Sequence, residues 1–140
     1  MKNIEANHQK MFIKYLEMKK QSGKVIEYFA PVNENTSSFT NRAVALKVEA
    51  KAKAMGKKAG VSDVVVILKN KVLFIEMKRP AKRLKSGKLS TAGIIVSEYQ
   101  KQFLENISQS EVCEGVVAYG FDEAKGFIDN QIKVYNGKIK

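Results

Sequence analysis

The sequence predicts a single α/β domain with a small central sheet covered by helices on both faces. Apolar residues at helical spacing alternate along the chain with short β-branched runs, in the order helix, strand, helix, β-hairpin, helix, strand, helix. The 140 residues, 44% of them hydrophobic, suffice for one buried core, and no linker or internal repeat divides them. Residues 1–140 are therefore expected to form one domain.

The first part of the chain predicts a helix, a strand and a second helix. Residues 3–20 carry an apolar stripe at helical spacing, and residues 24–30 form an aromatic and β-branched run typical of a strand. A polar, turn-rich loop follows at 31–38. The second helix is expected to begin at residue 39 or 40 and to end at 55, and it is rich in lysine.

The next stretch, residues 60–78, reads GVSDVVVILKNKVLFIEMK and predicts a β-hairpin with a two-residue loop at 69–70. Antiparallel pairing about that loop places Asp63 opposite Glu76, and Lys78 shares the face of Glu76 because side chains alternate along a strand. Two facing carboxylates repel each other unless a cation joins them. Oxygen ligands suit Mg²⁺ or Mn²⁺, so this end of the hairpin predicts a metal-dependent phosphodiesterase site.

After the hairpin, the sequence predicts a flexible basic loop at 79–93 and a third helix at 97–108. The loop holds five Lys and Arg residues beside the two carboxylates, which favours contact with nucleic acid. Ser97 and Gln100 have the spacing of a capping box, so both could simply fix the start of the helix.

The last part of the chain predicts a strand at 115–119 and a final helix. Asp122 is a suitable N-cap for that helix, which is expected to end near residue 130. The tail at 131–140 contains Asn-Gly, a type I′ turn signal between short apolar runs. We expect the tail to form a small edge hairpin or to fray.

The charge of the chain indicates a polyanionic partner. Its 25 Lys and Arg residues against 14 Asp and Glu residues give a formal net charge of +11, and nucleic acid is the polyanion that fits best. No apolar run approaches the roughly 18 residues of a membrane span, and the first residues lack the apolar core of a secretory signal. We therefore expect a cytoplasmic protein.

The single cysteine and the single histidine exclude several other chemistries. Cys113 alone cannot form an intrachain disulfide or a zinc knuckle. His8 alone cannot supply a site built from several histidines, and we expect it to be a packing or solvent-exposed residue.

Several segments together indicate a known family. Asp63 and the later Glu76-Met77-Lys78 have the order of a D…ExK motif. The accompanying segments are ExxxQ at Glu5 and Gln9, MGKKAGVSD at 55–63, FIEMKRP at 74–80, SEYQ at 97–100 and GVVAYGFDEA at 115–124. Over most of the chain these resemble the VRR-NUC (virus-type replication-repair nuclease) family of the PD-(D/E)xK nuclease superfamily. The resemblance implies a restriction-endonuclease-like core, in which helices flank a mixed β-sheet on both sides.

The resemblance also implies roles for individual residues. Lys78 would orient or help deprotonate the attacking water and stabilise the charge of the transition state. Gln100 would border the catalytic site and support it by hydrogen bonding. The ligands of Mg²⁺ or Mn²⁺ would be Asp63, Glu76, the backbone carbonyl of Met77 and, as an outer or second-metal ligand, Glu5.

The expected substrate is DNA. Small stand-alone members of the family resemble homodimeric nucleases that cleave branched DNA such as Holliday junctions, where two sites related by a twofold axis can nick matching strands. The alternatives are a nuclease acting on flaps, nicks or ends, and a basic DNA-binding module without catalysis. A small RNA-binding protein would explain the charge but not the paired carboxylates. The residues expected to contact DNA are Lys47, Lys51, Lys57, Lys58, Arg79, Lys82, Arg83, Lys85 and Lys88.

Overall fold

A four-stranded mixed sheet forms the centre of the protein. The computed structural model describes residues 3–31 and 41–139. Its strands are ordered β1 (Glu27–Phe29), β2 (Val64–Ile67), β3 (Val72–Lys78) and β6 (Cys113–Tyr119). β1, β2 and β3 pair antiparallel, whereas β6 pairs parallel with β3 after a long crossover. The predicted α/β class and central sheet are confirmed.

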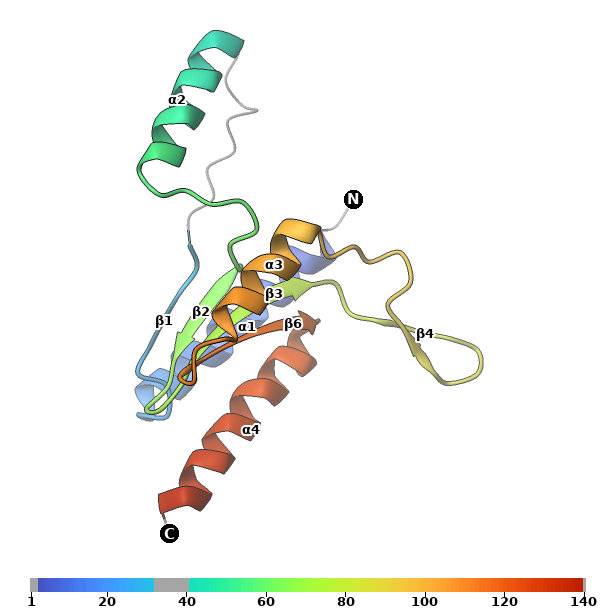
Figure 1. Ribbon diagram of the computed structural model, residues 1–140. Helices are drawn as coiled ribbons and strands as arrows, with labels where there is room; N and C mark the ends of the chain where they lie inside the picture. The colour runs from blue at the N-terminus through green and yellow to red at the C-terminus, as the bar shows by residue number, and fades with distance from the viewer. Residues whose placement is uncertain (1–2, 32–40, 140) are drawn as a thin grey trace.

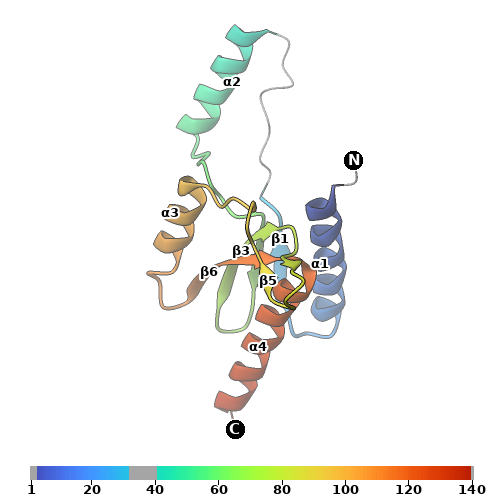
Figure 2. The ribbon, with the colours of Figure 1, turned by 90° about the vertical axis from the view of Figure 1, so that its right-hand side faces the viewer.

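Helices cover both faces of this sheet, as predicted. α1 (Ile4–Gln21) and α4 (Phe121–Ile139) lie on one face, and α3 (Glu98–Ile107) lies on the other, as Figure 2 shows. The alternation of β3 explains the two layers, since Leu73 and Ile75 are buried in the core with α1 and α4. Phe74 faces the opposite way and packs edge-on against Phe103 of α3, with ring centroids 6.0 Å apart.

The central hairpin has the register that the sequence predicts. Ile67 pairs with Val72 and Val64 with Ile75, while the Leu68 N–H donates to the Lys71 carbonyl at 2.8 Å. Continued by one residue, this register places residue 63 opposite residue 76. The polar loop is therefore short, and it fixes which residues meet at the far end of the hairpin.

α2 (Arg42–Ala54) buries none of its residues and lies apart from the sheet in Figures 1 and 2. It begins where the side chain of Asn41 accepts hydrogen bonds from the N–H groups of Ala43 and Val44. A helix over this stretch is confirmed, but the predicted starting residue and most of the loop at 31–38 lie outside the described residues.

The segment at 79–93 differs from the flexible loop expected for it. It contains two short antiparallel strands, β4 (Lys82–Arg83) and β5 (Leu89–Ser90), which form a separate hairpin. Gly87 allows the tight turn, because its φ of 83° lies in the left-handed region. The turn chemistry of Lys-Ser-Gly-Lys is a local signal that the charge-based expectation overlooked.

The prediction for the C-terminal tail is wrong. α4 continues to Ile139, and Asp122 lies inside its first turn rather than at the N-cap. Helix packing decides this, since Ile128 belongs to the core and Ile132 packs against it four residues later. A type I′ turn needs positive φ at both central residues, and Gly137 does not adopt it.

The only histidine fixes the start of α4. The Phe121 N–H donates to His8 Nδ1 at 2.8 Å, which joins α1 to the first turn of α4. His8 therefore has the packing role expected from the sequence. None of the helices in the described ranges combines the length and hydrophobicity needed to cross a lipid bilayer.

Candidate active site

Two charged side chains of β3 are buried beneath α3. Glu76 is 3% exposed and Lys78 is 9% exposed, although both types of residue normally remain in water. They lie on the α3 face because they alternate with the core residues Ile75 and Met77. A strand that carries core residues on one face and ions on the other is typical of a functional site rather than of a stable core.

Asp63 joins these two residues through the backbone of β3. It directly precedes β2, opposite Glu76, and its Oδ2 accepts a hydrogen bond from the Met77 N–H at 2.8 Å. In an extended strand the N–H and C=O groups of one residue point to the same side. The Met77 carbonyl therefore faces the side of Asp63, beyond the last paired residue of β2.

Gln100 of α3 connects the buried carboxylate to the buried lysine. Its Nε2 donates to Glu76 Oε1 at 2.5 Å, and its Oε1 accepts from Lys78 Nζ at 3.1 Å. The same Oε1 accepts from the Ser97 N–H at 2.9 Å, which completes a capping box. The predicted capping box is confirmed, and the same side chain contacts Glu76 and Lys78, while its role in catalysis stays a prediction.

The carboxylate of Glu76 is electrostatically unsatisfied. Burial and, after it, the charge of Asp63 raise the pKa of Glu76 to about 8, although Lys78 opposes the shift from 3.5 Å away. Glu76 Oε2 is buried without a hydrogen-bond partner among the described residues. A divalent cation would stabilise the ionised form of this buried carboxyl group beside a second carboxylate.

The raised pKa of Glu76 predicts that stability falls as the pH rises. Between about pH 5 and pH 8 the folded protein keeps a proton on Glu76 that the unfolded chain has already released, so the free energy of unfolding should decrease. One proton limits the slope to about 1.4 kcal/mol per pH unit. Urea denaturation in EDTA measures it, and Glu76→Gln should flatten the dependence. An unchanged slope in that variant would contradict the assignment.

The residues that could hold Mg²⁺ or Mn²⁺ are Asp63, Glu76 and the Met77 carbonyl. Two carboxylates and a carbonyl match the oxygen ligands that these ions prefer. Water molecules would complete the coordination, because such ions usually keep several of their waters when bound to protein. Within residues 3–31 and 41–139, no three His, Cys, Asp or Glu side chains come together as a metal site. Glu5 therefore does not join Asp63 and Glu76, and its predicted role as a ligand gains no support.

Gly60 helps to place the site, a role that the sequence did not reveal. A Cβ at Gly60 would lie 2.4 Å from the carbonyl carbon and oxygen of Tyr99 and 2.7 Å from the Gln100 nitrogen. Gly60 also has a φ of 81°. The turn before Asp63 thus touches the backbone of α3, which brings Gln100 over the hairpin. The available signal was a glycine three residues before the first carboxylate.

The residues expected to contact DNA occupy two regions. Lys47 and Lys51 are exposed on α2, and Lys58 is exposed just after it. Lys57 instead forms a salt bridge with Glu49 at 3.0 Å. The other five lie in the segment at 79–93, where the four after Arg79 are exposed: Lys82, Arg83, Lys85 and Lys88.

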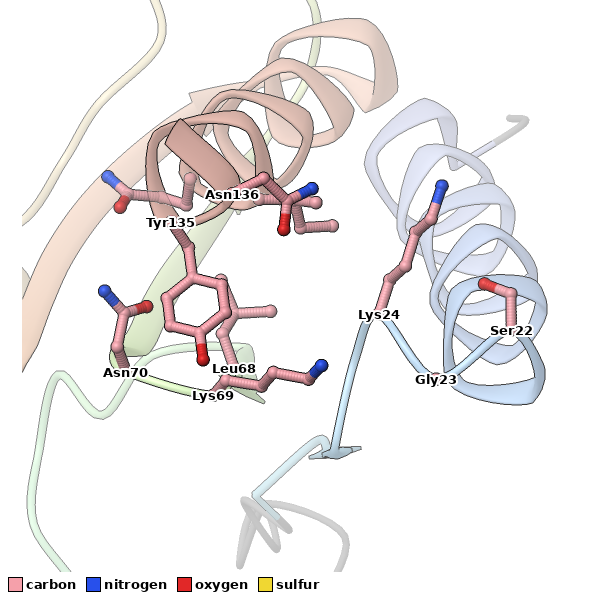
Figure 3. Close-up of a pocket in the computed structure, with 10 residues that line it drawn as sticks. Ser22, Gly23, Lys24, Leu68, Lys69, Asn70, Tyr135 and Asn136 are labelled. Carbon is pink, nitrogen blue, oxygen red and sulfur yellow. The ribbon is translucent and has the colours of Figure 1, made fainter. Parts of the chain in front are cut away.

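A hollow of about 180 Å³ lies at the other end of the hairpin and contains none of the candidate catalytic residues (Figure 3). It is bordered by the hairpin loop, the end of α1 and the last turns of α4. Lys69 Nζ lies 5.9 Å from the ring centre of Tyr135 there. The candidate active site is instead a buried side-chain cluster at the C-terminal end of β3.

Comparison with known proteins gives no relative: neither family models, nor curated proteins, nor solved structures match this chain.

Proposed function

We propose that this protein is a metal-dependent deoxyribonuclease with a PD-(D/E)xK core, of the VRR-NUC type that its motifs resemble. The observation that carries the proposal is the convergence of Asp63, Glu76 and Lys78 at one end of the hairpin, with Gln100 bridging the last two. A stable fold does not need this arrangement, because replacing a buried ion pair by well-packed apolar residues is often neutral or even stabilising. Phosphodiester hydrolysis can use all three groups, because carboxylates hold a metal ion and an ammonium group stabilises the negative charge that develops on the phosphate.

The residues have distinct roles in this reaction. Asp63, Glu76 and the Met77 carbonyl would hold Mg²⁺ or Mn²⁺, which lowers the pKa of bound water and neutralises phosphate charge. Lys78 orients the attacking water and stabilises the negative charge that develops on the phosphate oxygens. Gln100 holds Lys78 Nζ and Glu76 Oε1 with its two amide atoms, so the ammonium and the carboxylate keep their positions.

The charge distribution supports DNA as the substrate. Exposed lysines and arginines follow the candidate site directly in the segment at 79–93, and others lie on α2. Affinity for DNA should therefore fall steeply as the salt concentration rises.

Branched DNA and a homodimer complete the proposal. Two copies related by a twofold axis would present two cleavage sites to the matching strands of a junction. Exposed apolar residues on and just after α2 support self-association, since Val44 and Leu46 of the helix are 45% and 58% exposed and its C-cap Met55 is 78% exposed. Sedimentation of a monomer, with equal cleavage of junctions and linear duplexes, would contradict this part and favour a flap-, nick- or end-directed nuclease.

A cleavage assay with matched variants tests the function. Labelled DNA should be cut in Mg²⁺ or Mn²⁺ but not in EDTA, and Asp63→Asn should slow cleavage at least about 100-fold because it removes a metal-binding charge. Asp122→Asn, the same change at an exposed position in the first turn of α4, should cleave at the parental rate. DNA binding without cleavage in any divalent cation would identify an inactive binding module. Parental cleavage by Asp63→Asn would refute the site.

A further inference from the structure

The hairpin formed by β4 and β5 exposes two leucines that the fold does not use. Leu84 is 48% exposed and Leu89 is 65% exposed, and neither belongs to the hydrophobic core. Backbone contacts give the hairpin its shape, since the Leu84 N–H donates to the Lys88 carbonyl at 2.8 Å and Arg83 Nη1 donates to the Gly87 carbonyl at 2.9 Å. Figure 1 shows this hairpin projecting from the rest of the molecule. Leu89 pairs with Arg83 and Leu84 follows Arg83, so the two leucines lie on opposite faces of the hairpin and each is available to a partner.

The charge around the leucines indicates what that partner is. Residues 79–93 contain five cations and no acidic residue. None of the five forms a salt bridge with another described residue, and the two arginines donate to the backbone carbonyls of Gly93 and Gly87. The same hairpin of a second copy would repel this one, whereas a nucleic acid would be attracted. Leucines among unpaired cations thus match DNA, which has phosphates outside and apolar base faces inside.

The hairpin lies close to the candidate active site along the chain. β4 begins four residues after Lys78, so its first residue is within about 14 Å of Lys78, and Leu84 within about 22 Å, even if the chain is fully extended. Arg79 also ties the two ends of the segment together, because its Nη2 donates to the Gly93 carbonyl at 3.3 Å. DNA held at Lys78 would therefore meet the leucines within a few base pairs of the scissile phosphate.

We propose that Leu84 and Leu89, one on each face of the hairpin, form an apolar wedge that enters a DNA branch point between its exposed base faces; this inference rests on the proposed nuclease function and assigns the residues that distinguish branched from continuous DNA. Insertion of an apolar side chain into continuous duplex requires unstacking a base step, which is costly. At a branch point the base pairs have already lost a stacking neighbour, so the same contact costs less. The cations bind any DNA, and the leucines select the branched form.

A fluorescence experiment without cleavage tests the wedge. 2-Aminopurine is placed at the branch point of a four-way junction and at the same sequence position in a linear duplex, both in EDTA. The parent should change the junction signal at least about twofold, and Leu84→Ala/Leu89→Ala should lose most of that change. The double variant should also lower the junction-to-duplex affinity ratio about tenfold, with duplex affinity nearly unchanged.

Two control variants separate the leucines from charge and from general exposure. Val112→Ala removes an apolar side chain that is 58% exposed at the other end of the sheet, and should behave as the parent. Lys85→Ala/Lys88→Ala should weaken junction and duplex binding equally and reduce the salt dependence. Unchanged thermal unfolding of the leucine variant would show that its fold is intact.

Each remaining outcome decides the proposal. A leucine variant with the parental signal and affinity ratio overturns it. If the leucine variant keeps the parental DNA signal but loses binding to anionic vesicles, the leucines contact lipid, and the proposal is overturned. If it keeps the signal but sediments as a smaller species than the parent, the leucines contact a second copy, and the proposal is likewise overturned. If the junction signal depends on the leucines but the protein cleaves DNA in the presence of none of the divalent cations tested, the wedge is supported and the nuclease function is refuted.

Discussion

Replacing Lys78 by methionine is expected to slow DNA cleavage at least about 100-fold without unfolding the protein. Methionine keeps the length of the aliphatic chain, which is almost entirely buried beneath α3. It removes the ammonium group that lies 3.1 Å from Gln100 Oε1 and 3.5 Å from Glu76 Oε1. Glu76 can take up a proton instead, because burial already raises its pKa to about 8. The lost positive charge therefore affects the chemistry more than the stability.

Single-turnover cleavage at saturating enzyme measures this effect separately from DNA affinity, which is measured in EDTA. Lys101→Met is the matched control, since Lys101 lies on the same helix as Gln100 and pairs only with exposed Glu98 among the described residues. It should cleave at the parental rate and bind DNA only slightly more weakly. Parental cleavage by Lys78→Met would show that this lysine does not take part in the reaction.

Gly60→Ala is expected to lower the free energy of unfolding by about 3 kcal/mol or more, and to slow DNA cleavage by the molecules that still fold. The new Cβ would lie 2.4 Å from the backbone of Tyr99, a distance that requires α3 or the turn to move. Positive φ adds a further cost for any residue with a Cβ. Movement of α3 would carry Gln100 away from Glu76 and Lys78, so cleavage should fall together with stability.

Two other glycines isolate the cause of this effect. Gly56→Ala has a similar backbone cost, with φ at 105°, but its Cβ would meet no atom within 4 Å. We expect it to lose only about 1–2 kcal/mol and to keep its activity. Gly126→Ala, in open space on α4, should stabilise the protein by about 0.5–1 kcal/mol. Chemical denaturation compares all three, and equal losses for Gly60→Ala and Gly56→Ala would contradict the close approach.

The sequence by itself determined the central hairpin and the residues at its end. A two-residue polar loop and alternating side chains set the register, so Asp63, Glu76 and Lys78 could be placed together before any tertiary contact was known. The order of the helices and of the strands of the central sheet followed for the same reason, since periodicity is a local property of the chain. Such local signals are strong wherever one face of an element must be buried.

The tertiary structure decided how the other elements meet this hairpin. Helical packing of Ile128 and Ile132 against the core outweighed the Asn-Gly turn signal, and the predicted tail hairpin became the end of α4. Long-range contacts also brought Gln100 over Glu76 and left Glu5 outside the cluster. Gly60 controls that approach through a contact with residues about forty positions later in the chain. No local sequence pattern encodes this contact between Gly60 and α3, because the free energy of such contacts depends on which surfaces the whole fold brings together.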